Sequence, residues 1–108
     1  MSIDWSKLRS AADIENERVL ATYIEWKRER EDRVCAIVVE VDGLHFDGDE
    51  DSQNRMARAV AAADLMTETT EWTLADNTVA MVSVQTLKTA CRLAGEEQTR
   101  IWHEGRPA

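Results

Sequence analysis

The spacing of apolar residues changes along the chain from a helical period to short β-branched runs and back. Residues 3–33 contain no glycine or proline and consist largely of good helix formers. Their apolar stripe consists of Leu8, Ala12, Val19, Tyr23 and Trp26, at spacings of four, seven, four and three. This pattern predicts one long helix with a partial heptad repeat, which polar residues interrupt.

A strand pair and a helix are expected next. Segment 36–41 is rich in β-branched residues, and segment 44–46 returns after Asp42-Gly43. This dipeptide favours a two-residue type I′ turn, because both central residues of that turn need positive φ. An acidic stretch containing Asp49 then offers N-caps to a helix over residues 51–66.

The second half of the chain repeats this order. Residues 67–70 are interpreted as a connector, and segments 72–74 and 79–82 as two strands around a turn at Asp76-Asn77. Ser83 is expected to cap a last helix that continues past Gly95.

A period of 34 residues relates the two halves. Gly43 matches Asn77 at the turns, and Asp49 matches Ser83 at the helix starts. We therefore predict an α+β fold of order α-ββ-α-ββ-α. A helix for docking or oligomerisation covers residues 1–33, and a duplicated hairpin-helix domain covers residues 34–108.

Composition and charge disfavour two classes of partner, nucleic acids and membranes. The 108 residues suffice for one modest core, and the formal net charge of −8 lies almost entirely after residue 33. An acidic surface repels phosphate, so nucleic-acid binding is not expected. The longest apolar run, residues 34–39, is too short for a membrane span, and the first nine residues do not resemble a signal peptide. We expect the protein to be synthesised in the cytoplasm. We expect no association with a membrane.

One acidic segment resembles the start of a calcium loop. Asp47, Asp49 and Asp51 occupy alternate positions, as in an EF-hand. However, Ser52 stands where the bend glycine is needed, and Arg58 stands where the closing glutamate is needed. A solvated helix-capping loop is therefore the better interpretation, and no metal is expected.

Residue types for catalysis are sparse. His45 and His103 are the only histidines, and neither has a partner at metal-ligand spacing. Cys35 and Cys91 lie among apolar neighbours and are interpreted as small buried hydrophobes. No base can be assigned to activate a nucleophile, and there is no glycine-rich phosphate loop. We expect no enzymatic activity and no cofactor.

The four tryptophans offer the better functional signal. Trp72 is expected in the core, whereas Trp5, Trp26 and Trp102 lie on terminal helices that a small interior cannot fully cover. Packing within the chain and cover by a partner both remain open. The candidate protein-interaction residues are Leu8, Val19, Tyr23, Trp26 and Trp102.

Segments 41–55 and 72–77 carry a resemblance to a known family. They read V-D-G-L-H-F-D, then D-E-D-S-Q-N-R, then W-T-L-A-D-N. This resembles a domain of unknown function of tailed bacteriophages and prophages, with the pattern "V-D-G…F-D-x-D-x-x-S-x-x-R" followed by "W-x-x-x-D-N". The resemblance spans about residues 15–104 and implies a role in tail-fibre or tail-fibre-assembly proteins. It implies no catalytic residue.

Three functions follow as expectations. The first is a non-enzymatic structural or adaptor protein of a phage tail, at the fibre or baseplate and in the virion, that contacts other tail proteins. By analogy with fibre proteins it would form a homo-oligomer, with a trimer as the expected form. The second is a tail-fibre assembly chaperone that is absent from the finished particle. The third is an acidic inhibitor of a host protein.

Overall fold

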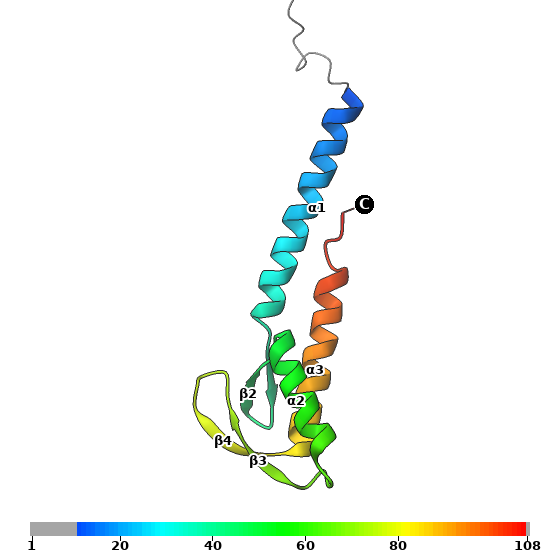
Figure 1. Cartoon of the computed structure of the whole chain (residues 1–108). Coiled ribbons are helices and arrows are strands. Elements are labelled where there is room, and N and C mark those ends of the chain that lie inside the picture. Colours follow the sequence, from blue (N-terminus) through cyan, green and yellow to red (C-terminus); the bar gives the residue numbers. More distant parts are fainter. Residues whose placement is uncertain (1–10, 108) are drawn as a thin grey trace, which may run out of the picture.

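Three helices and two β-hairpins follow one another in the computed structural model, which describes residues 11–107 (Figure 1). The elements are α1 (Ala11–Cys35), β1 (Val38–Val41), β2 (Leu44–Asp47), α2 (Glu50–Ala62), β3 (Thr69–Thr73), β4 (Val79–Ser83) and α3 (Val84–His103). This order confirms the predicted α+β fold of α-ββ-α-ββ-α. The predicted start of the first helix lies outside the described residues.

The first hairpin has the turn that its sequence predicts. Strands β1 and β2 are antiparallel, from Val38 opposite Asp47 to Val41 opposite Leu44. The two residues between them have positive φ, 53° at Asp42 and 81° at Gly43. Both central positions are therefore left-handed, as a type I′ turn requires.

The second hairpin begins earlier than predicted, and its turn lies at the predicted residues with a geometry different from that of the first. Strand β3 begins at Thr69, so the segment interpreted as a connector already pairs with β4, Thr69 lying opposite Ser83. At the other end only Asn77 has positive φ, 67°, and its N–H donates to Leu74 O at 2.9 Å. This loop is a type I turn followed by a left-handed residue, which is the common three-residue hairpin connection.

The Asp76 side chain stabilises this second loop. Its carboxylate accepts hydrogen bonds from the backbone N–H of Thr78 at 3.0 Å and from the Thr78 hydroxyl at 2.6 Å. Hydrogen bonds to the charged form favour it, so they hold the pKa of Asp76 below its usual value. Asp76 therefore acts locally, as a turn residue.

Both later helices start at the predicted caps. Asp49 precedes α2, and its carboxylate accepts a hydrogen bond from the Ser52 hydroxyl. Ser83 precedes α3, and its hydroxyl accepts from the Thr86 N–H at 3.1 Å. The cap positions thus keep the period of 34 residues that relates the two turns.

The helix ends were less predictable. Helix α2 stops at Ala62 and not at residue 66, because Ala63 is extended and the Glu68 N–H turns back to Leu65 O. Helix α3 continues through Gly95 to His103, as predicted. The left-handed Gly105, with a φ of 68°, then redirects the chain after α3.

Helices α2 and α3 lie side by side and the hairpins pack against them (Figure 1). The main core cluster consists of Phe46, Met56, Leu74, Val82, Leu87 and Ala90. A second cluster consists of Val34, Ile37, Ala94 and Ile101. The last turn of α1 is therefore fixed to the far half of α3.

The rest of α1 projects from this body (Figure 1). Every residue from 11 to 22 is exposed, whereas Tyr23, Trp26 and Arg30 are half-buried and Val34 is buried. Burial thus follows one face of the helix and stops about halfway along it. The first half of α1 is a helix with nothing packed on it within the described chain.

Candidate functional site

The structure places the predicted contact residues in three different settings. Leu8 lies outside the described residues. Val19 is 44% exposed on the projecting half of α1, and Trp102 is 43% exposed on α3. Tyr23 and Trp26 are half-buried, and they contact the C-terminal segment.

Tyr23 and Trp26 form hydrogen bonds that connect α1 to the C-terminal segment. The Tyr23 hydroxyl donates to Pro107 O at 3.1 Å, and the Trp26 indole N–H donates to Glu104 O at 3.1 Å. The two rings meet edge to face, with centroids 6.2 Å apart. Of the two alternatives left open by the sequence, packing within the chain accounts for these two side chains.

Arg30 connects the same helix to Trp102. Its guanidinium carbon lies 4.8 Å from the Trp26 ring centroid and 4.5 Å from the Trp102 ring centroid. The arginine is therefore sandwiched between two aromatic faces, and each contact of this kind is worth about 0.5–2 kcal/mol. An ion pair of Arg33 with Glu104, at 3.3 Å, lies one turn further along α1.

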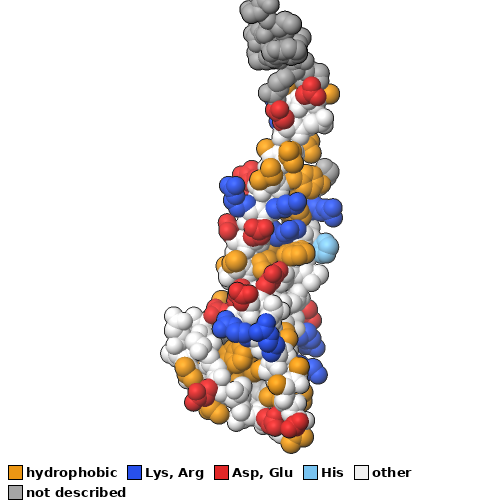
Figure 2. All heavy atoms as spheres, viewed as in Figure 1, with side chains coloured by type: hydrophobic (Ala, Val, Ile, Leu, Met, Phe, Trp, Pro, Cys, Tyr) orange, Lys and Arg blue, Asp and Glu red, His pale blue; other side chains and the backbone are white. Residues whose placement is uncertain are grey.

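The projecting half of α1 is an uncovered helical surface, since every residue from 11 to 22 is exposed. Its exposed apolar residues are Ile14, 41% exposed, Val19, 44%, Leu20, 60%, and Ile24, 50%. Figure 2 shows apolar side chains along this part of the molecule, between acidic and basic ones. Val19–Tyr23 and Leu20–Ile24 are two adjacent pairs at i,i+4, so together they form a wide apolar face.

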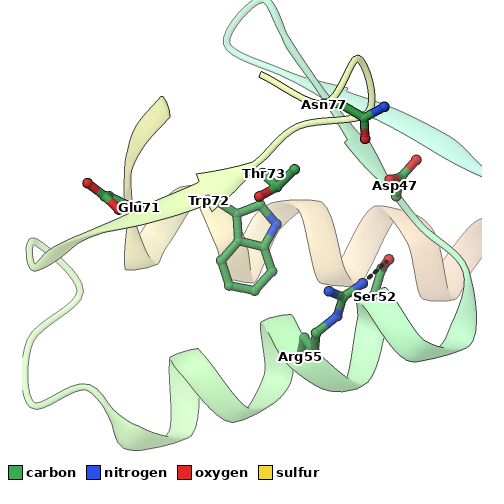
Figure 3. Close-up of a pocket in the computed structure, with 7 residues that line it drawn as sticks. All are labelled: Asp47, Ser52, Arg55, Glu71, Trp72, Thr73 and Asn77. Carbon is green, nitrogen blue, oxygen red and sulfur yellow. Dashed lines mark hydrogen bonds between the residues drawn. The ribbon is translucent and has the colours of Figure 1, made fainter. Parts of the chain in front are cut away.

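A second candidate site is a pocket of about 350 Å³ between α2 and the second hairpin (Figure 3). Its lining comes from four segments of the chain: Asp47, Ser52, Arg55, Glu71, Trp72, Thr73 and Asn77. The Trp72 ring extends from β3 toward α2, with its indole nitrogen on the side of Arg55 and Asp47 (Figure 3). Glu71 points away from the other side chains (Figure 3).

Ser52 organises the α2 side of this pocket. It is the buried polar residue of the core region, 4% exposed. Its hydroxyl donates to Asp49 and accepts from the Arg55 guanidinium at 3.4 Å. One buried hydroxyl thus links the cap of α2 to the arginine that faces the pocket.

The pocket residues are not recognisable as a site from the sequence. From the sequence, Asp47 is part of an acidic loop, Trp72 is expected in the core and Asn77 is expected in a turn. The structure shows Trp72 half-buried at the pocket wall. The available signal was the family pattern itself, because Asp47, Ser52, Arg55, Trp72 and Asn77 are all positions that carry the resemblance.

The cysteines and histidines do not form a reactive pair in the described chain. Cys91 is half-buried, its thiol donates to Gln53 O at 3.5 Å, and burial raises its pKa. Cys35 is exposed, so its interpretation as a buried hydrophobe was wrong, because in the packed last turn of α1 the neighbouring Val34 occupies the buried position. His45 lies on the surface, 3.7 Å from Glu40.

Among residues 11–107, no three His, Cys, Asp or Glu side chains gather closely enough to hold a metal ion. Within the same range, no helix is both long and apolar enough to cross a membrane.

Comparison with known proteins gives one match. The model of a family described as "Domain of unknown function (DUF4376)" matches residues 10–106. Neither the curated proteins nor the solved structures give a match. The family match spans both hairpins and all three helices. The chain therefore belongs to this family of domains of unknown function.

Proposed function

We propose that this chain is a non-enzymatic structural or adaptor protein of a bacteriophage tail, associated with the fibre or baseplate, that acts through protein–protein contacts. The observation that carries the proposal is the projecting half of α1, where every residue from 11 to 22 is exposed. Apolar side chains on a helix that covers nothing in its own chain are typical of a surface buried in an assembly. The phage context rests on the resemblance of the motif residues.

The occupant of this helix face is, on this proposal, a second copy of the chain. In proteins most of the stability of a helix comes from packing of an apolar face, and residues 11–22 of α1 have no such packing within the described chain. Burying one Val, Leu or Ile side chain fully contributes about 1.5–3 kcal/mol. On this proposal, the exposed Val19, Leu20 and Ile24 contact two neighbouring helices, as each helix does in a trimer, while Tyr23 remains held by its own C-terminal segment.

Molar mass in solution tests this arrangement. Size-exclusion chromatography with light scattering should give three times the 12.3 kDa of one chain. Leu20→Gln combined with Ile24→Gln keeps helix-forming residues while removing the apolar pair, and should give a monomer. The matched control Arg28→Gln, exposed on the same helix, should leave the mass unchanged. A wild-type mass of a single chain would contradict the trimer.

The place of the protein in the virion needs a different measurement. Mass spectrometry of purified phage particles should detect the chain in stoichiometric amounts with tail proteins. Its presence in infected cells but absence from particles would instead support a tail-fibre assembly chaperone. Loss of trimer formation and absence from particles are separate results, so either part of the proposal can fail without the other.

A further inference from the structure

Three exposed polar side chains of the pocket between α2 and the second hairpin, those of Asp47, Arg55 and Asn77, have hydrogen-bonding capacity that other described side chains leave unused. Arg55 makes one long hydrogen bond, to Ser52. Asp47 and Arg55 line the same pocket without forming an ion pair. Two other exposed arginines of the described surface are paired, Arg33 with Glu104 and Arg92 with Glu96.

Asn77 and Trp72 complete this set. The Asn77 side chain extends from the second turn toward Asp47 (Figure 3), and its amide makes no hydrogen bond to another described residue. The Trp72 indole N–H also makes none, although the half-buried ring itself packs against the core. The pocket thus combines one aromatic ring with a carboxylate, a guanidinium and an amide that are all available to a ligand.

The chemistry of these groups limits what the pocket can take. A purely apolar ligand would desolvate Asp47 and Arg55 without replacing their hydrogen bonds with water, which is costly. A strongly anionic ligand would suit Arg55 but would meet the Asp47 carboxylate in the same pocket. The two facing charges cancel, because Glu71 points away (Figure 3).

A saccharide ring meets both requirements. One side of a pyranose presents C–H groups that pack on an aromatic face, and its edge presents hydroxyls that both donate and accept hydrogen bonds. The volume of about 350 Å³ is at the lower end of the range of about 300–1,000 Å³ for small-molecule sites. We propose that this pocket, formed by Asp47, Arg55, Trp72 and Asn77, binds a neutral sugar residue.

Each side chain has a defined part in this site. The Trp72 ring contacts the C–H side of the sugar. The Asp47 carboxylate accepts hydrogen bonds from ring hydroxyls, the Arg55 guanidinium donates to them, and the Asn77 amide does both. Ser52 is a positioning residue, since it reaches the ligand only through Arg55. The pocket is at the opposite end of the molecule from the projecting half of α1 (Figure 1), so the two surfaces can be occupied together.

Nuclear magnetic resonance titration of the full chain tests the proposal. The probes are the methyl glycosides of glucose, galactose, mannose and N-acetylglucosamine, with sialic acid and a short peptide with a free carboxylate as comparators. At least one neutral glycoside at millimolar concentration should shift the Trp72 indole and Asn77 side-chain signals, whereas the two anionic comparators should not.

Variants link the shifts to the pocket. Asn77→Gly keeps the positive φ of the turn while it removes the amide, and Arg55→Ala removes the guanidinium. Each should weaken sugar binding about tenfold, the loss expected from one hydrogen bond worth about 1.4 kcal/mol. Arg58→Ala, on the same helix but outside the pocket lining, is the matched control and should bind as the wild type does.

Three results would overturn the proposal. The first is no shift of the Trp72 indole signal with any of the four neutral glycosides. The second is an equal affinity for the sugar, as measured by these shifts, in the wild type, Asn77→Gly and Arg55→Ala. The third is a shift with the peptide but not with the sugars, which would assign the pocket to a protein partner. The double substitution at Leu20 and Ile24 should leave sugar binding intact, so failure of the α1 proposal is separable from failure of this one.

Discussion

Replacing Phe46 by alanine is expected to remove a large part of the free energy of unfolding. Phe46 is fully buried in the main core cluster, among side chains from both hairpins and both later helices. Truncation of a buried phenylalanine to alanine costs about 3–5 kcal/mol, from lost burial and from the cavity that remains. A small domain has only about 5–15 kcal/mol in total, so much of the variant should be unfolded under mild denaturing conditions.

Urea denaturation followed by circular dichroism measures this loss. The comparison needs equal protein concentrations, because association raises apparent stability by mass action. Val79→Ala is the matched control, since Val79 is 62% exposed on β4 and its truncation should change the free energy of unfolding by about 0.5 kcal/mol or less. Equal midpoints for Phe46→Ala and the wild type would show that Phe46 does not lie in a packed core.

Substitution of alanine at two glycines, Gly48 and Gly95, should change the stability of the protein in opposite directions. At Gly48 an added Cβ would lie 2.5 Å from Ile37 Cγ2 and 2.9 Å from Ala94 Cβ, where the helix backbone of α3 prevents retreat. Overpacking of this kind costs about 1–3 kcal/mol. At Gly95, inside α3, the nearest atom is Gln53 Oε1 at 3.8 Å, so Gly95→Ala should gain about 0.5–1 kcal/mol from helix propensity.

Thermal unfolding of the two variants beside the wild type checks this pair. Gly48→Ala should lower the Tm and Gly95→Ala should raise it. A Gly48→Ala variant as stable as the wild type would mean that the segment between β2 and α2 can move away from Ile37 and Ala94. A destabilised Gly95→Ala variant would mean that α3 approaches α2 more closely than the Gln53 contact indicates.

Local signals in the sequence were sufficient for the order of elements. Asp42-Gly43 specified its own turn, because both residues tolerate positive φ at low cost. Ser83 specified the start of α3, because its side-chain oxygen accepts from an N–H three residues later, whereas Asp49 occupies the cap position of α2 without a side-chain hydrogen bond to the helix backbone. These effects do not depend on distant parts of the chain, so the 34-residue period is a property of the sequence itself.

The boundaries that were mispredicted depend on pairing or packing with other segments. Thr69 joins β3 because Ser83 lies opposite it, and nothing local distinguishes residues 67–70 from a connector. Helix α2 ends at Ala62 although residues 63–66 continue its apolar pattern, since the chain must turn there to begin β3. Propensity is a weak guide where tertiary contacts decide the outcome.

For the candidate sites, the sequence determined which residues are present, and the tertiary structure decided which of them meet. The stripe on α1 was visible as a pattern, but only the fold shows that Tyr23 and Trp26 are held by the C-terminal segment while Leu20 and Ile24 are uncovered. Taken locally, Asp47 and Asn77 are only strand-end and turn residues. They form one pocket with Trp72 because the second hairpin folds back over α2, a placement set by burial of apolar side chains far apart in the chain.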